Sequence, residues 1–328
     1  MRLALTLALL VLATVDAQAQ QPGKIYRLGV PDFGSTPSPQ LRATFAGAMQ
    51  ELGWVEGKNL LTERRCCAAG NMDRLNEFVA DLVQVKVDAI LVTSPHAARA
   101  VRAATTTIPL VFVGVANPVG NGLVASLAKP GGYTTGVTQV AGAPGDFLAK
   151  QIQLIREMVP TALRVGVLIN PSNPAFDRYK PGELAGWMTE RSGTTVEIFE
   201  ARTPNDLAPA FAQAKRARIE VFVVTGDPVF FSERKAIAEL AAEHRLPATY
   251  WFREHAEAGG LMAYSTNFHY LMRQGATYVD RIFRGAYPGD LPVEQAARFE
   301  LTVNVKTAKA LRLTIPRGMM ERIDRVIE

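Results

Sequence analysis

The side chains that could do chemistry in this chain are few, and they stand far apart in the sequence. The four histidines are His96, His244, His255 and His269. No two of them have metal-ligand spacing, and neither a GxSxG motif nor a cysteine–histidine arrangement is present. Asp227 follows an apolar run and is the one carboxylate that we place at a cleft, but one carboxylate is not an acid–base pair. The sequence therefore predicts no metal site, no cofactor and no catalytic residues.

The two cysteines, Cys66 and Cys67, are neighbours in the sequence. Adjacent cysteines close only a strained ring, so a disulfide framework is not expected. No CxxC or histidine-rich spacing accompanies them, which argues against a metal site. We therefore expect two ordinary thiols at the end of a strand.

Polar loops follow the apolar runs and are the places to look for ligand contacts. In one of them Ser94 can cap a helix with Pro95 at its first position, which leaves backbone N–H groups free for a carboxylate or phosphate. A good cap without a ligand role is an equal alternative. Asn, Ser and Asp side chains in other loops can contact a ligand, although satisfying turn backbone is their commoner role. We expect roughly one in three of the aromatic residues near strand ends to form a ligand wall. These aromatic residues are Phe33, Phe230, Phe231, Tyr250, Trp251 and Phe252.

The elements that must position these loops alternate between short β-branched runs and amphipathic helical stretches, which indicates a parallel α/β architecture. Two similar α/β units follow one another, and the elements after the second unit suggest a chain that crosses between two lobes more than once. The expected strands are 26–30, 60–64, 88–92, 110–115, 134–138, 164–169, 196–200, 221–224, 248–251, 260–264 and 299–303. The expected helices are 39–52, 72–85, a helix from 94, 147–158, 180–191, 205–216, 232–244, 271–284 and a short helical tail. In open α/β sheets ligands bind outside the carboxyl ends of the strands, so two such edges facing each other across a hinge would form a closing cleft.

The N-terminus resembles a secretory signal peptide. Arg2 precedes an apolar run over residues 3–15, and Ala17-Gln18-Ala19 offers a small-x-small site with cleavage expected before Gln20. The run is too short to span a bilayer comfortably. A core helix is the alternative, but polar residues follow immediately. We expect residues 1–19 to be removed and the mature protein to be periplasmic.

Length and charge narrow the class of protein further. The chain has 328 residues, a length that suggests two domains, and its formal net charge is +5. The charges are interspersed without a basic tract, which is a poor basis for nucleic-acid binding. We expect a monomer that binds a small molecule and no nucleic acid.

Several longer phrases resemble the ABC transporter substrate-binding family often labelled tryptophan/tyrosine type. The most specific are Asn117–Gly120 continuing into Gly122–Gly132, Asp227-Pro228 with Leu240–Pro247, and the tail from Leu291–Gln295 to Val305–Leu311. The similarity extends from about Ile25 to Glu328. It implies a type I periplasmic-binding fold, with two doubly wound parallel-sheet lobes joined by three crossing segments and a hinge. Lobe 1 would comprise residues 24–138 with about 266–298, and lobe 2 residues 139–265 with about 299–328.

The resemblance also implies a function, which is capture of a small organic solute for an inner-membrane ABC permease. The ligand would be an amino acid, an aromatic compound or a carboxylate, and hinge closure would hold it without any covalent step. The implied ligand contacts are Phe33, Gly34, Ser35, Thr93, Ser94, Pro95, His96, Ala116 and Asn117 from lobe 1, and Asn170, Asn173 and Asp227 from lobe 2.

Three alternatives make different demands on the sequence. An α/β enzyme would need a dinucleotide glycine fingerprint or paired catalytic groups, and neither is visible. A transcription regulator would need a helix-turn-helix before the first strand, where a signal-like segment stands instead. A receptor domain would need a membrane-spanning helix, although a ligand-sensing subunit that feeds a membrane receptor remains open.

Overall fold

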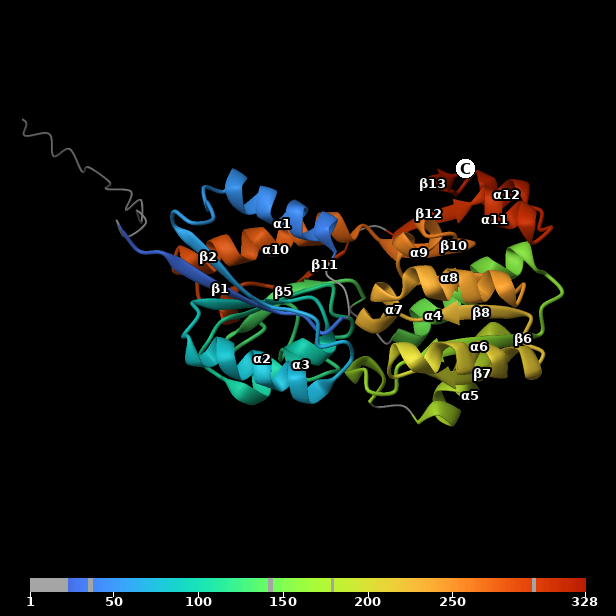
Figure 1. The fold of residues 1–328 in the computed structure, drawn as a ribbon, viewed down its shortest axis with the longest axis horizontal. Coiled ribbons are helices and arrows are strands. Elements are labelled where there is room, and N and C mark those ends of the chain that lie inside the picture. The colour runs from blue at the N-terminus through green and yellow to red at the C-terminus, as the bar shows by residue number, and fades with distance from the viewer. Residues whose placement is uncertain (1–22, 35–37, 141–143, 178–179, 297–298) are drawn as a thin grey trace, which may run out of the picture.

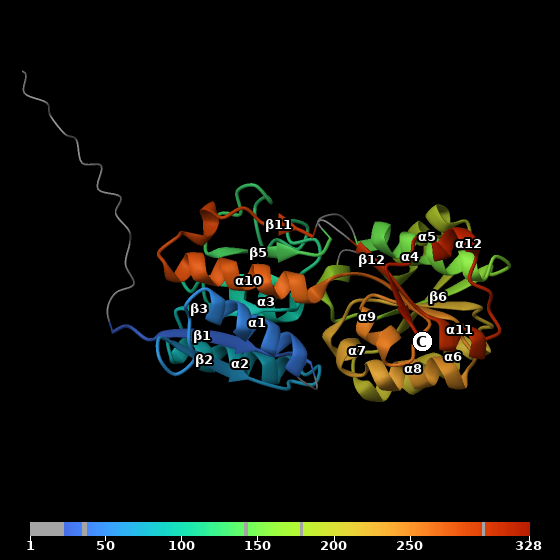
Figure 2. The same ribbon diagram turned by 90° about the horizontal axis from the view of Figure 1, so that it is seen from above.

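The computed structural model describes residues 23–34, 38–140, 144–177, 180–296 and 299–328. Two β-sheets organise the molecule, one of six strands and one of seven, and each has helices on both faces (Figure 1). We call the parts built around these sheets lobe 1 and lobe 2. The lobes lie next to each other along the long axis of the molecule (Figure 2).

Lobe 1 has the strand order β11-β5-β4-β3-β1-β2, and its strand pairs are all parallel. Helices α1 and α10 pack on one face of the sheet, while α2 and α3 pack on the other. The strands are β1 (Tyr26–Pro31), β2 (Leu60–Arg65), β3 (Ala89–Val92), β4 (Leu110–Val113), β5 (Thr134–Thr138) and β11 (Glu294–Gln295). The helices are α1 (Pro39–Glu51), α2 (Met72–Gln84), α3 (Pro95–Ala104), α10 (Phe268–Phe283) and the 3-10 helix η3 (Pro288–Asp290).

Lobe 2 has the strand order β13-β12-β10-β9-β8-β6-β7, in which only the β10–β12 pair is antiparallel among the described residues. Helices α4, α5, α11 and α12 cover one face, and α6 and α8 cover the other. The strands are β6 (Arg164–Ile169), β7 (Thr195–Glu200), β8 (Val221–Val224), β9 (Ala248–Tyr250), β10 (Met262–Thr266), β12 (Phe299–Asn304) and β13 (Arg325–Ile327). The α-helices are α4 (Pro144–Met158), α5 (Pro181–Ser192), α6 (Leu207–Arg216), α7 (Pro228–Ser232), α8 (Arg234–Glu243), α9 (Arg253–Glu257), α11 (Val305–Ala310) and α12 (Arg317–Met320). The 3-10 helices are η1 (Pro174–Phe176) and η2 (Pro204–Asp206).

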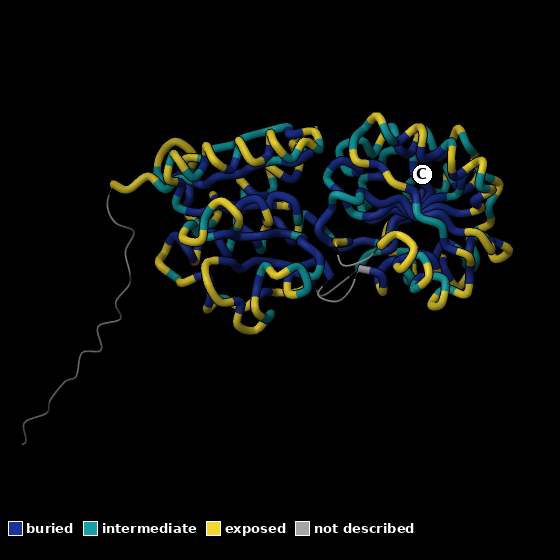
Figure 3. The backbone as a smooth tube through the Cα atoms, turned by 90° about the horizontal axis from the view of Figure 1, so that it is seen from below, coloured by how far each residue is buried: buried dark blue, intermediate teal, exposed yellow. Residues whose placement is uncertain are grey.

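Local sequence explains where the elements form. Strands β3 and β8 read Ala-Ile-Leu-Val and Val-Phe-Val-Val, and each of their residues is buried because helices cover both sheet faces. Figure 3 shows buried backbone running through the interior of both lobes. Helix α3 begins where the Ser94 hydroxyl accepts a hydrogen bond from the Ala97 N–H at 3.1 Å, with Pro95 at the first position.

The chain passes from one sheet to the other at three places: after β5, after β10 and after β11. Lobe 1 is therefore completed by α10 and β11, which follow most of lobe 2 in the sequence. This arrangement confirms the expected doubly wound, two-lobed α/β fold. Two short strands were not expected. Strand β11 is only two exposed polar residues, and β13 ends a tail that was expected to be helical throughout.

The expectation of two free thiols is wrong, because Cys66 and Cys67 form a disulfide. In a strand, neighbouring side chains point to opposite faces, which keeps adjacent thiols apart. Strand β2 ends at Arg65, however, and the cysteines lie in the following turn, where Cys67 has a φ of 76°. The bridge is local and joins no two elements.

Among the described residues, no helix combines the length and apolar character needed to cross a bilayer. The expected signal peptide, residues 1–19, lies outside the described residues.

Candidate functional site

A cavity lies between the lobes at the carboxyl ends of their strands. It encloses about 1160 Å³ of space that protein atoms do not fill, part of it open to solvent. Lobe 1 contributes residues that follow β1, β3 and β4, and lobe 2 contributes residues that follow β8 and β9. This is the edge at which open α/β sheets bind ligands.

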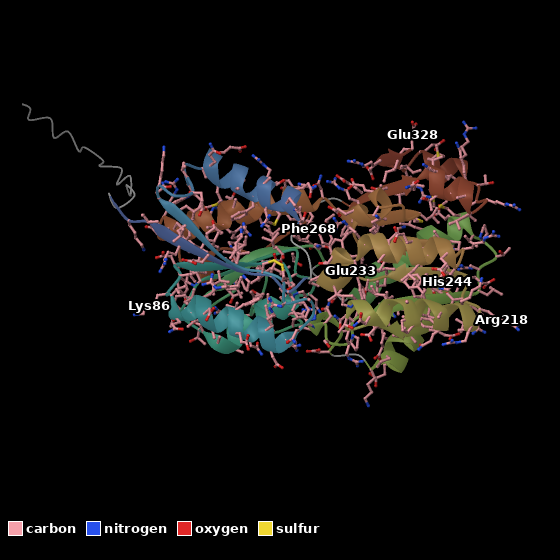
Figure 4. All side chains as sticks on the ribbon, viewed as in Figure 1. Lys86, Arg218, Glu233, His244, Phe268 and Glu328 are labelled. Atoms are coloured by element: carbon pink, nitrogen blue, oxygen red, sulfur yellow. A yellow bond between two sulfur atoms is a disulfide. The ribbon has the colours of Figure 1, made fainter. Side chains whose placement is uncertain are left out.

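Aromatic side chains make much of the cavity wall. Phe45 and Phe268 come from α1 and α10 of lobe 1, and Phe231, Trp251 and Phe252 come from lobe 2. Phe268 stands at the junction of the lobes (Figure 4). Its ring fits there because Gly114 has no side chain: a Cβ on that residue would lie 2.4 Å from the ring. Such a wall suits a large apolar or aromatic ligand.

Asp227 is the most deeply buried carboxylate that lines the cavity, with 1% of its surface exposed. It caps α7 by accepting a hydrogen bond from the Val229 N–H at 2.9 Å, and it accepts further bonds from the Asn170 and Asn173 side-chain amides at 3.3 and 3.0 Å. Burial raises its pKa to about 6, although these hydrogen bonds favour the charged form. At neutral pH the Asp227 carboxylate is therefore mostly ionised, and the three hydrogen bonds that it accepts fix its orientation.

His96 of lobe 1 lies next to the Asp227 carboxylate. Its ring is fully buried, is stacked on Phe33 with 4.1 Å between ring centroids, and places Nε2 4.0 Å from Asp227 Oδ2. Burial, with a smaller contribution from the nearby Arg99 charge, lowers the pKa of His96 to about 3, so the ring is neutral at pH 7. His96 and Asp227 are therefore in contact across the two lobes, but they do not form an ion pair at pH 7, because the histidine is neutral.

Other contacts also join the two lobes beside the cavity. The Arg99 guanidinium of α3 pairs with the Asp177 carboxylate of lobe 2. Gly34 packs so closely on α7 that a Cβ there would lie 2.6 Å from Ser232 Oγ and 3.3 Å from the Pro228 carbonyl oxygen. The structure therefore shows a closed arrangement, in which both lobes touch around the cavity.

The sequence-predicted site residues fall into groups. Five line the cavity: Gly34, Thr93, Pro95, Ala116 and Asp227. Ser94, Phe33 and His96 lie behind this wall. Ser94 caps α3, and Phe33 stacks on His96. Asn170 and Asn173 brace Asp227.

Two predicted residues remain. Asn117 is occupied in a turn, with φ 49° and its side-chain oxygen accepting from the Gly120 N–H at 3.1 Å. Ser35 lies outside the described residues. Of the six aromatic candidates, Phe231, Trp251 and Phe252 line the cavity, and Phe33, Phe230 and Tyr250 are buried elsewhere.

Sequence reasoning missed several residues that line the cavity. Gln139 accepts a hydrogen bond from Trp251 Nε1 at 2.5 Å. It directly follows β5, and this position at the end of a strand could have marked it as a candidate cavity residue. Asp32 and Arg64 also stand at strand ends. Arg42 lies inside α1, where nothing in the local sequence marks it.

No group of three or more histidine, cysteine, aspartate or glutamate side chains within the described part of the chain could hold a metal ion.

Comparison with known proteins decides the family. Residues 35–327 match the model of the family described as ABC transporter substrate binding protein. The chain belongs to this family. Among curated relatives of this substrate-binding protein is a protein named tyrosine-binding protein from Clostridioides difficile (strain R20291). The two are 25% identical over 287 residues, which is 87% of this chain and 80% of the relative.

Two solved structures show the same fold as this substrate-binding protein. A conserved domain protein from Vibrio cholerae matches with a TM-score of 0.83 at 25% identity, covering 92% of this chain and 100% of that one. An ABC domain from Streptococcus pneumonia in complex with L-Trp matches with a TM-score of 0.82 at 24% identity, covering 93% and 100%.

Proposed function

We propose that this protein captures an α-amino acid with a large apolar or aromatic side chain, in the cavity between its lobes, and presents it to an ABC permease. The observation that carries the proposal is a cavity lined by both lobes, with aromatic walls and one buried, ionised carboxylate. The amino-acid names of the related proteins, tyrosine and L-Trp, support the same ligand class.

Each part of an amino acid has a suitable partner in this cavity. The Asp227 carboxylate gives the cavity wall a buried negative charge, which attracts a ligand ammonium group. The Thr93 hydroxyl is exposed just before α3, at the positive end of the helix dipole, where it can donate to a ligand carboxylate. The aromatic side chains enclose the remainder of the ligand.

Binding is coupled to lobe closure in this proposal. The lobes, residues 24–138 with about 266–298 and residues 139–265 with about 299–328, rotate about the three crossing segments. Asp227 and α3 belong to different lobes, so a ligand that contacts both favours the closed form by its differential affinity for the two states. The protein acts as an exported, periplasmic monomer without a catalytic step or a nucleic-acid partner, and cleavage before Gln20 releases it.

A thermal-shift screen of the twenty L-amino acids tests this function. Aromatic and large apolar amino acids should raise the melting temperature, because a ligand of the native state stabilises it by mass action. Titration calorimetry on Asp227→Asn should then show affinity lowered by roughly 10- to 150-fold, the range for loss of a charged hydrogen-bond partner. The control is Asp73→Asn, an exposed aspartate in the first turn of α2. No stabilisation by any amino acid, or equal affinity in the Asp227 variant and the control, would contradict the proposal.

A further inference from the structure

Three charged side chains line the cavity on the side of α1. Asp32 follows β1, Arg42 belongs to α1, and Arg64 is the penultimate residue of strand β2. Arg42 is exposed at the mouth, whereas Arg64 and Asp32 are partly buried. Arg42 and Arg64 also line a second hollow on the outer surface between α1 and β2, so they stand where the cavity opens.

This cluster carries an excess of one positive charge. Burial lowers the pKa of Arg64, and the nearby Arg42 charge lowers it further, while Asp32 opposes both effects. Glu56 also acts on Arg64, but it does not line the cavity, and its carboxylate oxygens accept from the Thr62 N–H and hydroxyl at 2.8 and 2.7 Å. Two guanidiniums therefore face the cavity against the single carboxylate of Asp32.

Neither guanidinium donates a hydrogen bond to an acceptor within the described residues. Arg74 and Arg281 of this lobe share this property, but their guanidiniums lie over the Phe78 and Tyr278 rings and do not line the cavity. Other arginines of the lobe are paired. Arg27, for comparison, reaches the Glu63 carboxylate at 3.0 Å, and Arg65 reaches the same carboxylate at 3.4 Å. A half-buried guanidinium without a fixed acceptor has donors available for a ligand.

The cluster stands apart from Asp227. Helices α1 and α10 cover one face of the lobe 1 sheet, and α3, whose His96 meets Asp227, covers the other (Figure 1). Asp227, Arg42 and Arg64 line the same cavity, so a long ligand with its amino group at Asp227 can extend toward the two arginines.

We propose that Arg42 and Arg64 form a second subsite, which receives a carboxylate at the end of the ligand remote from its amino-acid head. The subsite rests on the proposed function, because the head must first be held at Asp227 and α3. It makes the preferred ligand an aromatic or long apolar amino acid with an acidic tail. Asp32 reduces the excess positive charge of the subsite.

Titration calorimetry with L-phenylalanine and 4-carboxy-L-phenylalanine tests the subsite, since these probes differ only in the tail. The wild-type protein should bind the carboxylated probe roughly tenfold or more tightly, a modest gain because Arg42 is exposed. The preference should shrink as the salt concentration rises. The double variant R42Q/R64Q should bind the two probes with equal affinity, so that the preference is lost. Arg216→Gln, at an exposed position of α6, is the control and should keep the preference.

The possible results separate the two proposals. If L-phenylalanine binds and the tail carboxylate adds no affinity, the subsite is overturned and the proposed function stands. If the preference survives in R42Q/R64Q, the subsite is likewise overturned. If neither probe binds but another amino acid does in the thermal-shift screen, the subsite is overturned and the proposed function stands. If no amino acid binds, both are overturned.

Discussion

Replacing Gly34 by valine should weaken ligand binding by obstructing closure of the lobes. A Cβ at this position would lie 2.6 Å from Ser232 Oγ and 3.3 Å from the Pro228 carbonyl oxygen of the opposite lobe. A serine hydroxyl can turn away, but the carbonyl belongs to the backbone of α7 and cannot. The φ of Gly34 does not lie in the left-handed region, so the backbone of lobe 1 accepts a side chain here.

The size of the effect follows from overpacking. Extra methyl groups forced into a packed contact cost about 1–3 kcal/mol, and here the cost falls on the closed state only. Because ligand binding requires closure, the dissociation constant should rise roughly 5- to 150-fold. In an open form the lobes would be separated at Gly34, so the unfolding free energy of the ligand-free variant should equal that of the wild type.

Calorimetric titration with the best amino acid from the screen measures this change, and small-angle X-ray scattering with and without ligand follows closure directly. Gly47→Val is the matched control, because a Cβ on this glycine of α1 meets nothing within 4 Å. A dissociation constant for Gly34→Val within twofold of the wild-type value would refute the reasoning that the lobes meet at this residue when ligand is bound.

Three further predictions concern stability and the cysteines. Burial lowers the pKa of His96 and His255 to about 3 from 6.5, so the stability that each contributes is present above pH 6.5 and lost as the pH falls. As the pH falls from 7.5 to 5, each of these histidines should lower the unfolding free energy by about 2 kcal/mol. Proton uptake by Asp227, whose pKa is raised in the folded state, offsets part of this loss. Urea titrations of the wild type and His255→Gln measure the difference, and an equal pH dependence in both proteins would contradict the prediction. Ser94→Ala should lower the unfolding free energy by about 1 kcal/mol through loss of the α3 cap, and an unchanged guanidinium midpoint would show that the hydroxyl is dispensable. Iodoacetamide should modify Cys66 and Cys67 only after reduction, as read by mass spectrometry; alkylation of the untreated protein would argue against the disulfide.

The fold was predictable because its signals are local and repeated. Strands such as β3 and β8 are continuous apolar runs, and helices such as α3 carry a cap and a proline at their start. Strand β11, by contrast, is two polar residues whose conformation depends on pairing with β5, which lies far away in the sequence.

The cavity was only partly predictable. Polar residues at strand ends, such as Thr93 and Asp227, could be placed there because parallel strands end at one edge of a sheet. Whether a neighbour such as Asn173 faces the cavity or braces another side chain depends on tertiary contacts that spacing does not encode. Arg42 reaches the cavity only because α1 packs beside α10, and that contact joins segments more than two hundred residues apart.

The direction of the first and last strands makes this molecule suited to optical sensing. Strand β1 runs toward the cavity, so its start near Lys24 lies at the outer end of lobe 1. Strand β12 runs antiparallel to β10, away from the cavity, and β13 runs parallel to β12; Glu328 lies at the upper edge of lobe 2 (Figures 1 and 4). A donor and an acceptor dye at these two positions would sit on different lobes, at the surface and away from the cavity. A small rotation between the lobes would then change the energy transfer between them, and the protein would report ligand concentration as colour.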